Sequence, residues 1–293
     1  MTTSFASSAP RPTYRVPLAH GGVLELGARP LVMGILNVTP DSFDESGTVD
    51  VRQAVDRALA MEAAGADIVD VGGESTRPGA EPVDAKTELA RIMPVIDAVR
   101  GRLRIPISVD TYKASVADSA IAGGAHMVND VSGLLYDPPL ARVVAGHGAS
   151  IVLMHTRGRS KDMYQQAEYA DIARDVAAEL QARVDAAVAA GVPVTSILVD
   201  PGVGFAKRAE HSYGVLARLP EIADALRRPL LVGPSRESFM RAAAGGADAS
   251  GRDWTTAAAV AASVLNGAHI VRVHAVGPMV QVVRAAEEIR QAG

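Results

Sequence analysis

The sequence predicts a single (β/α)₈ TIM barrel with a short N-terminal β-hairpin. Eight apolar runs alternate with eight helical patterns between residues 31 and 291, which is the unit order of a closed parallel barrel. A glycine, a small residue and a short apolar run also recur together, in "GADIVDV", "GAHMVNDV", "GASIVLMH" and "GAHIVRVH". Glycine favours the end of a helix and the run favours a buried parallel strand. Each copy therefore predicts a joint at which a helix passes into a strand.

The predicted elements follow one another closely along the chain. "TYRVP" and "GVLELG" flank His20-Gly21-Gly22 and predict the hairpin. The eight apolar runs predict strands at 31–36, 67–71, 105–109, 126–129, 150–154, 196–199, 229–232 and 269–273. Helical patterns occupy 50–64, 85–100, 112–122, 138–146, 168–190, 211–227, 254–266 and 277–291. Asp50 can cap the first helix, and Gly65 and Gly191 can end two others.

A doubly wound open sheet is the alternative arrangement of alternating strands and helices. We favour the barrel because eight units fit closure and because no G-x-G-x-x-G fingerprint follows the first strand. No linker rich in Pro, Gly or Ser divides the chain, so we expect one domain over residues 14–293. The polar, proline-broken residues 1–13 are expected to form a disordered tail.

The composition excludes several classes of function. The 293 residues include no cysteine, which rules out disulfide frameworks, thiolate metal sites and cysteine nucleophiles. The formal net charge of −4 does not suit a protein that coats nucleic acid. No apolar run approaches the roughly 18 residues of a membrane span, and the N-terminus lacks the apolar core of a secretory signal. We expect a cytoplasmic protein with neither nucleic acid nor membrane as a partner.

Polar residues gather where the predicted strands end, which is the active-site edge of a barrel. In chain order these ends carry Asn37, Gly72-Gly73-Glu74, Asp110, Asn129-Asp130, His155, Asp200, Ser235-Arg236, and Arg272 with His274. Asp110 and Asp200 offer carboxylate acceptors, and Asn129 offers an amide that both donates and accepts. This set suits a flat heterocycle with N–H donors on its edge. We interpret Asp130 as a turn or capping residue.

A second group of residues at the same strand ends could hold an anion. It comprises Arg77, Lys207, Arg236 and Arg272, and guanidinium groups bind phosphate oxygens in forked pairs. Asn37 could give a neutral oxygen to Mg²⁺. For Lys207, a solvated surface position is the alternative. The loops "NVTPDSFDESGTVD" and "GGESTRPGAEPVD" exceed common lengths and have the composition of active-site lids.

Eight motifs occur in order along the chain: "MGILNVTPDSF", "DVGGESTRPGA", "ISVDTYKA", "NDVSG", "LMH", "DPGVGF", "LVGPSRESF" and "VRVHAV". From about Leu31 to the C-terminus they resemble those of the dihydropteroate synthases, folate-pathway enzymes of the pterin-binding barrel family. The resemblance implies that 6-hydroxymethyl-7,8-dihydropterin diphosphate and 4-aminobenzoate are joined to give 7,8-dihydropteroate and diphosphate. It also implies Mg²⁺ as cofactor, sulfonamides as inhibitors, and a homodimer formed through the late helices 254–266 and 277–291.

The resemblance implies roles for individual residues. Those expected at the pterin are Asp110, Asn129, Met154, Asp200, Phe205, Gly233 and Glu237. Those expected at the diphosphate or the aminobenzoate are Phe43, Thr76, Arg77, Ser235, Arg272 and His274. Catalytic roles fall to Asn37, Arg77, Lys207, Arg272 and His274, with Asn37 also beside Mg²⁺.

Four positions depart from the family pattern. The lysine of S-R-K-S-F is Glu237, the second glycine of G-F-G-K is Ala206, an asparagine after the following histidine is Ser212, and the aspartate of R-V-H-D is Ala275. A carboxylate cannot donate a hydrogen bond as an ammonium does unless it is protonated. Two alternatives therefore stay open: a non-catalytic pterin-binding paralogue, and a methyltransferase that passes a methyl group from methyltetrahydrofolate to a corrinoid protein. The complete pair of long-loop motifs argues against the methyltransferase.

Overall fold

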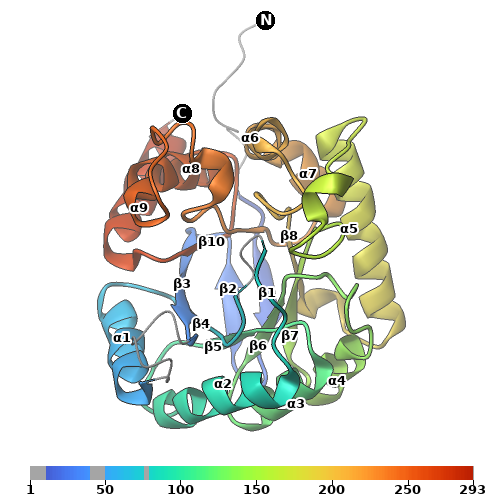
Figure 1. Cartoon of the computed structure of the whole chain (residues 1–293), viewed down its shortest axis with the longest axis vertical. Helices are drawn as coiled ribbons and strands as arrows, with labels where there is room; N and C mark the ends of the chain where they lie inside the picture. The colour runs from blue at the N-terminus through green and yellow to red at the C-terminus, as the bar shows by residue number, and fades with distance from the viewer. Residues whose placement is uncertain (1–10, 40–49, 76–78, 293) are drawn as a thin grey trace, which may run out of the picture.

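An eight-stranded parallel sheet, ringed by helices, forms the body of the molecule (Figure 1). The computed structural model describes residues 11–39, 50–75 and 79–292. The strands are β3 (Leu31–Asn37), β4 (Ile68–Gly72), β5 (Ile107–Asp110), β6 (Met127–Asp130), β7 (Ser150–Met154), β8 (Ile197–Asp200), β9 (Leu231–Val232) and β10 (Ile270–Val273). Their order is β8-β7-β6-β5-β4-β3-β10-β9, and a parallel bridge between Val199 and Leu230 joins the two ends. The predicted barrel is therefore confirmed.

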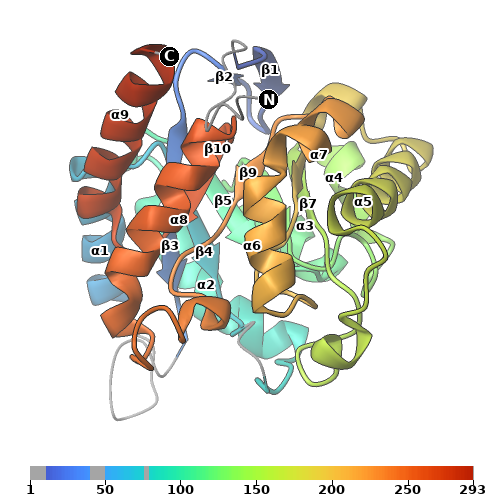
Figure 2. The same cartoon turned by 90° about the horizontal axis from the view of Figure 1, so that it is seen from above.

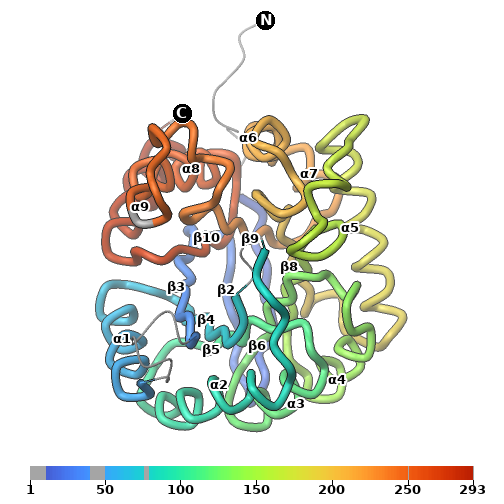
Figure 3. The backbone as a smooth tube through the Cα atoms, in the orientation of Figure 1, coloured from blue at the N-terminus to red at the C-terminus, as the bar shows by residue number. Residues whose placement is uncertain are grey.

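The helices surround the strands, and α9 returns beside α1 (Figure 3). They are α1 (Val51–Ala63), α2 (Ala85–Val99), α3 (Ala114–Ala122), α4 (Leu140–His147), α5 (Ile172–Ala189), α6 (Ala209–Ala217), α7 (Leu219–Leu226), α8 (Asp253–Leu265) and α9 (Val276–Ala292). The prediction of one helix over 211–227 is wrong. Pro220 lies in the first turn of α7, where its missing N–H is harmless, but it cannot continue α6. None of the described helices is long and apolar enough to cross a membrane.

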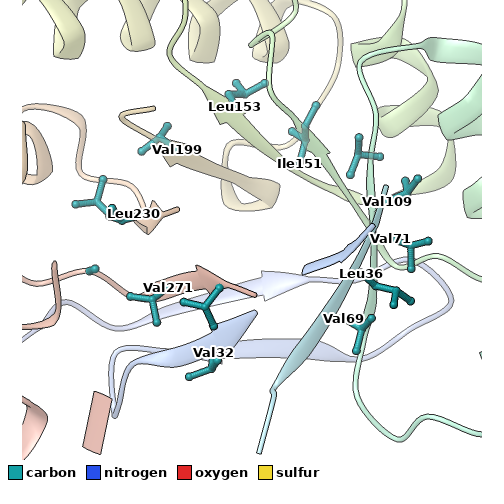
Figure 4. Packing of buried hydrophobic residues seen from close by; sticks show 14 of the residues in the cluster. Val32, Leu36, Val69, Val71, Val109, Ile151, Leu153, Val199, Leu230 and Val271 are labelled. Carbon is teal, nitrogen blue, oxygen red and sulfur yellow. The ribbon is translucent and has the colours of Figure 1, made fainter. Parts of the chain in front are cut away.

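Alternate residues of each strand face two environments, as the two-residue period of a strand requires. One set packs beneath the helices, and Figure 4 labels ten of its members, from Val32 of β3 to Val271 of β10. The other set fills the interior of the barrel at one end with the side chains of Met33, Ile68, Met127, Val152, Leu198, Leu231 and Ile270. This second set, with Leu31, forms the plug of the barrel.

The predicted hairpin is confirmed and closes the same end of the barrel (Figure 2). It consists of β1 (Tyr14–Pro17) and β2 (Val23–Leu26), which pair antiparallel. Its apolar side chains, Val16, Leu18, Leu24 and Leu26, belong to the same buried cluster as the plug. One end of the barrel is therefore apolar and covered, so a polar ligand has to enter from the opposite end.

Residues 11–13 are part of the described structure, whereas the sequence predicts them as the end of a disordered tail. Residues 1–10 lie outside the described part, but Arg11 is buried and its guanidinium donates to both carboxylate oxygens of Glu287 on α9, at 3.0 and 2.7 Å. The carbonyl of Pro12 lies 3.0 Å from Nε2 of His269. The local sequence around Arg11 is polar and rich in proline, so it does not predict burial against a residue 276 positions away. Residues 11–13 were therefore predicted to be disordered.

Candidate active site

A polar layer lies above the plug, inside the barrel. It consists of Asp70, Asp110, Asn129, Asp200 and Arg272, which come from β4, β5, β6, β8 and β10. The first four are buried, and the Arg272 side chain is largely buried. The strand period explains the arrangement, because Asp70 and Arg272 lie two residues beyond plug residues of the same strands and share their inward direction.

Arg272 is the centre of this layer. Its Nε donates to Oδ2 of Asp70 and its Nη2 donates to Oδ2 of Asp110, each at 2.6 Å. Oδ2 of Asp70 also accepts from Nδ2 of Asn129 at 3.0 Å. Although burial opposes the charge of Arg272, these carboxylates raise its pKa above the ordinary value. Asp70 was not predicted as a site residue, and the available signal was a carboxylate inside an otherwise apolar strand.

Two carboxyl groups of the polar layer titrate near neutral pH. Burial raises the pKa of Asp110 to about 7, against the opposing effect of Arg272. Burial also raises the pKa of Asp200 to about 6, although Oδ1 of Asp200 accepts from the Gly202 N–H at 2.7 Å. A Cβ on Gly233 would lie 3.7 Å from Cβ of Arg272 and 3.9 Å from Oδ2 of Asp200. A side chain at position 233 would therefore contact both Arg272 and Asp200.

Lys207 belongs to the loop that follows β8, and its side chain points into the protein. Its side chain is fully buried, and Nζ lies 2.7 Å from Nδ1 of His155 and 3.1 Å from the carbonyl of Phe205. Burial and the charge of Lys207 lower the pKa of His155 to about 4, so the imidazole is neutral and Nε2 donates to Glu179 at 3.1 Å. Burial lowers the pKa of Lys207 to about 7, opposed by Asp200 and Glu179. The Lys207 charge is therefore buried below the mouth and acts on Asp200 through space.

The loop after β8 passes close to two neighbouring segments. Gly202 has φ of +65°, and a Cβ there would lie 2.1 Å from the carbonyl of His155. Gly204 has φ of +86°, and a Cβ there would lie 2.6 Å from Oε2 of Glu237. Both glycines of "DPGVGF" are thus required by backbone conformation and by space. Ala206 also has a positive φ, of 49°.

The rim of the barrel carries two further hydrogen-bonded groups. Nδ1 of His274 lies 2.9 Å from Oγ of Ser235, which also accepts from the His274 backbone N–H at 3.0 Å. Arg236 pairs with Asp253 of α8, at 2.7 Å between Nε and Oδ1. The carboxylate of Asp130 accepts from the backbone N–H groups of residues 132 and 134, which confirms its interpretation as a turn residue.

A cavity of about 280 Å³ lies between the loops that follow β4 to β8, and no residue of the polar layer is among its lining residues. Phe205 lies on one of its walls, and Tyr112 and Tyr136 form another, with ring centroids 5.1 Å apart. The guanidinium of Arg159 lies 4.2 Å from the ring of Tyr136. Met154, whose backbone pairs in register with Asp200, is buried next to the polar layer.

Comparison with known proteins identifies the family. The model of a family described as pterin binding enzyme matches residues 33–274, which is most of the chain. The chain belongs to the pterin-binding enzymes.

Relatives within this family are close. A dihydropteroate synthase of Synechocystis is 45% identical over 275 residues, covering 93% of this chain and 95% of its own. A Yersinia pestis dihydropteroate synthase with a sulfonamide drug is 39% identical, with TM-score 0.87 over 94% of this chain and 98% of its own. The Burkholderia cenocepacia enzyme complexed with 7,8-dihydropteroate is 38% identical, with TM-score 0.84 over 95% of this chain and 97% of its own. Longer bifunctional or folate-synthesis relatives are matched over 36–56% of their length.

Glu237 is the most consequential departure of this pterin-binding enzyme from the expected motifs. Its half-buried carboxyl group lies against Gly204. Burial raises the pKa of Glu237 to about 7, with Arg272 and Arg252 opposing the rise and Asp200 adding to it. Position 237 therefore faces the same charged groups as the polar layer, and it brings a carboxyl group where the resemblance leads us to expect a lysine.

Three predicted site residues of this pterin-binding enzyme, Phe43, Thr76 and Arg77, lie outside the described residues. Within residues 11–39, 50–75 and 79–292, no group of three or more His, Asp or Glu side chains is placed to hold a metal ion. Asn37 is half-buried at the end of β3, in register with Gly72.

Proposed function

We propose that this protein catalyses the dihydropteroate synthase reaction. It joins 6-hydroxymethyl-7,8-dihydropterin diphosphate to 4-aminobenzoate and releases 7,8-dihydropteroate and diphosphate. The observation that carries this proposal is the buried set of Asp110, Asn129 and Asp200 around Arg272, in a chain 45% identical to a dihydropteroate synthase. This set combines carboxylate acceptors with an amide that both donates and accepts, which suits a flat heterocycle with N–H donors on its edge.

The carboxylates of Asp110 and Asp200 bind the pterin by accepting its ring and amino N–H groups. Both must be ionised to do so, and their raised pKa values favour a partner that brings donors into the pocket. Asn129 adds an amide to the same edge of the ring. Met154, Phe205 and Gly233 supply the flat, largely apolar surroundings that a heterocycle needs.

The diphosphate is held at the mouth by Arg272 and His274, together with Arg77. Asn37 would hold Mg²⁺, which prefers oxygen ligands and keeps several waters, so one amide oxygen beside substrate phosphates is sufficient. When bound, the ion neutralises charge that develops on the departing diphosphate. Thr76, Phe43 and Ser235 complete the diphosphate and aminobenzoate end of the site.

The reaction forms a C–N bond at the pterin methylene and breaks its C–O bond to diphosphate. The electron pair of that C–O bond leaves with the diphosphate, towards the positive charge of Arg272. The amine of 4-aminobenzoate is already nucleophilic, and it loses one proton to solvent after attack. No strong general base is required, so Lys207 acts as a buried charge near Asp200 rather than by contact with substrate.

We also propose that the protein is a cytoplasmic homodimer that sulfonamides inhibit. The sulfonamide complex of the Yersinia pestis relative supports the inhibition. The dimer is expected from the resemblance to the dihydropteroate synthases. Trp254 of α8 and Ile289 of α9, which are 88% and 63% exposed, are positions at which an interface through the late helices can be tested.

A non-catalytic pterin-binding paralogue is the second candidate, and Glu237 is the observation that favours it. One experiment separates the candidates: the protein is incubated with dihydropterin diphosphate, 4-aminobenzoate and Mg²⁺, and diphosphate release is followed. Release at a rate far above that without protein supports the synthase. Pterin binding in calorimetry without release indicates the paralogue, and methyl transfer from methyltetrahydrofolate to a corrinoid protein would indicate the methyltransferase.

A further inference from the structure

We propose that Asp70 is a positioning residue for Asn129 and also partly neutralises Arg272. Its carboxylate sets the direction of the Asn129 amide at the pterin end and reduces the positive charge that the Arg272 guanidinium offers at the diphosphate end. This inference rests on the proposed function, because it concerns how the same pocket orders the two halves of pterin diphosphate.

The first contact concerns Asn129. Its Nδ2 donates to Oδ2 of Asp70 at 3.0 Å, and both side chains are buried. An ionised carboxylate can only accept, so the amide must turn its NH₂ group, and not its oxygen, towards Asp70. The second N–H and the carbonyl oxygen of Asn129 then remain, and no side chain of the described residues bonds to them. A ligand therefore meets a donor and an acceptor in a fixed order.

The second contact concerns Arg272. Its Nε donates to the same Asp70 oxygen at 2.6 Å, while Nη2 donates to Asp110. Asp110 is also expected to bind the pterin, so its hold on Arg272 changes when ligand arrives. Asp70 is fully buried in the middle of β4 and is not among the residues expected to bind the pterin. It therefore stays beside the guanidinium when the ligand binds, and its negative charge weakens the attraction of Arg272 for an anion.

These two contacts predict effects of opposite sign when the Asp70 charge is removed. In Asp70→Asn the new amide can donate as well as accept, so Asn129 is no longer forced into one orientation and pterin binds less tightly. Arg272 loses one of its two carboxylate partners, so a free anion binds equally tightly or more tightly. A residue that only supports the fold would weaken both ligands together.

The barrel offers a matched control in Ser108. It pairs in register with Asp70 on β5, is equally buried, and has no hydrogen-bond partner for its hydroxyl group among the described residues. Ser108→Ala removes a buried polar atom from the same layer without touching Arg272 or Asn129. It is expected to leave both ligand affinities unchanged.

Isothermal calorimetry on the full chain tests the proposal, with 6-hydroxymethylpterin and, separately, inorganic pyrophosphate with Mg²⁺. Asp70→Asn is expected to weaken 6-hydroxymethylpterin by about tenfold or more, which corresponds to one lost hydrogen bond to a charged group, while pyrophosphate binds at least as tightly as to the wild type. Equal weakening of both ligands, or no change in either, would overturn the proposal. A wild type that binds neither ligand would instead overturn the proposed function.

A second variant covers the case in which Asp70→Asn does not fold. The exchange Asp70→Asn with Asn129→Asp keeps one amide and one carboxylate between β4 and β6, and it preserves the net charge. The side chain of residue 129 then has no N–H group that could donate to the pterin. We therefore expect 6-hydroxymethylpterin to bind more weakly than to the wild type, while pyrophosphate still binds. Wild-type affinity for 6-hydroxymethylpterin in this exchanged protein would contradict the orienting role of Asp70.

Discussion

Glu237 brings a carboxyl group to a site that already holds Asp200 and must accept a polyanionic substrate. We expect Glu237→Lys to raise kcat/KM for pterin diphosphate by about tenfold, because a repelling charge is replaced by an attracting one worth roughly 1–2 kcal/mol near a protein surface. Glu237→Gln separates the two effects and should give a smaller gain. Steady-state diphosphate release measures both. If Glu237→Lys lowers kcat/KM while Glu237→Gln does not, the carboxyl group has a positive role in this site.

The same residue predicts a distinct pH dependence. Pterin binding should strengthen as pH rises through about 6 and then about 7, because Asp200 and Asp110 must lose their protons to accept from the ring. Ionisation of Glu237, also at about 7, opposes the second step because it places a further anion beside Asp200. Glu237→Gln should therefore strengthen binding above pH 7 and leave the rise through pH 6 unchanged. Calorimetric affinities for 6-hydroxymethylpterin between about pH 5 and 9 check this, and equal affinities of the two proteins above about pH 7 would contradict it.

Ala206 holds a left-handed backbone conformation, with φ of +49°, where the family motif has glycine. Such a conformation costs an alanine roughly 1 kcal/mol more than a glycine. Ala206→Gly is expected to stabilise the protein by about 0.5–1 kcal/mol, seen as a rise of about 1–3 °C in Tm. Gly204→Ala is the matched opposite change, because its φ is +86° and a Cβ would meet Glu237. A lower Tm for Ala206→Gly would show that the backbone is not strained there.

Single residues also mark the limit of prediction from sequence. Asp110, Asn129 and Asp200 stand at strand ends, so the barrel rule alone brings them together. Asp70 stands within a strand, and its importance depends on a partner 202 positions away, Arg272. The burial of Lys207 likewise depends on its contact with His155, which follows β7. Contacts between side chains of distant strands are set by barrel closure, which no local pattern encodes.

At the scale of elements, the tail and α9 are joined by the buried pair of Arg11 and Glu287. We expect Glu287→Ala to cost about 3 kcal/mol, because it leaves a buried guanidinium without its carboxylate. For a domain of this size that lowers Tm by about 6–12 °C. Glu288→Ala is the control, since Glu288 is the exposed neighbour on the same helix. A loss equal to that of Glu288→Ala would show that the pair does not hold the tail.

The linkage of Glu287 to pH has a definite sign. Although burial opposes it, Arg11 holds the pKa of Glu287 below its ordinary value in the folded protein. The stability from this pair is therefore present above the unfolded pKa, which is about 4.3, and is lost as pH falls through the lower folded value. The difference in Tm between wild type and Glu287→Ala should narrow in acid.

The existence and order of the elements were predictable, whereas their ends were less so. Short apolar runs located all eight barrel strands, because strands buried on both faces are almost continuously apolar. The run at 229–232 forms only the two-residue strand β9, which has a regular ladder with β10 and a single bridge to β8. The helix predicted at 168–190 begins at Ile172, because the Asp171 carboxylate caps the backbone N–H groups of the next residues.

The whole molecule separates an apolar end from a polar end. The plug and the hairpin close one end, so the polar layer is reached from the other, and the strands β4, β6, β8 and β10 contribute to both. This division follows from the alternation of side chains along each strand once the barrel is closed. The polar strand ends could therefore be predicted from the sequence. The conformations of the loops that follow those ends could not. Loop conformation depends on ligands and on contacts with the whole rim, not on local residue patterns.

Assembly is the last property of the whole molecule for which the surface makes a prediction. Helices α8 and α9 pack on each other and carry Trp254 and Ile289, the two most exposed large apolar side chains of the described residues. We expect a dimer in solution by light scattering, with twice the 30.4 kDa mass of the chain. Ile289→Asp should shift it towards monomer, because a charge cannot be buried in an apolar contact without a partner. Val188→Asp is the control, since Val188 is 44% exposed on α5, across the ring from α9 (Figure 1). A monomeric wild type, or equal dissociation by both variants, would refute an interface through α8 and α9.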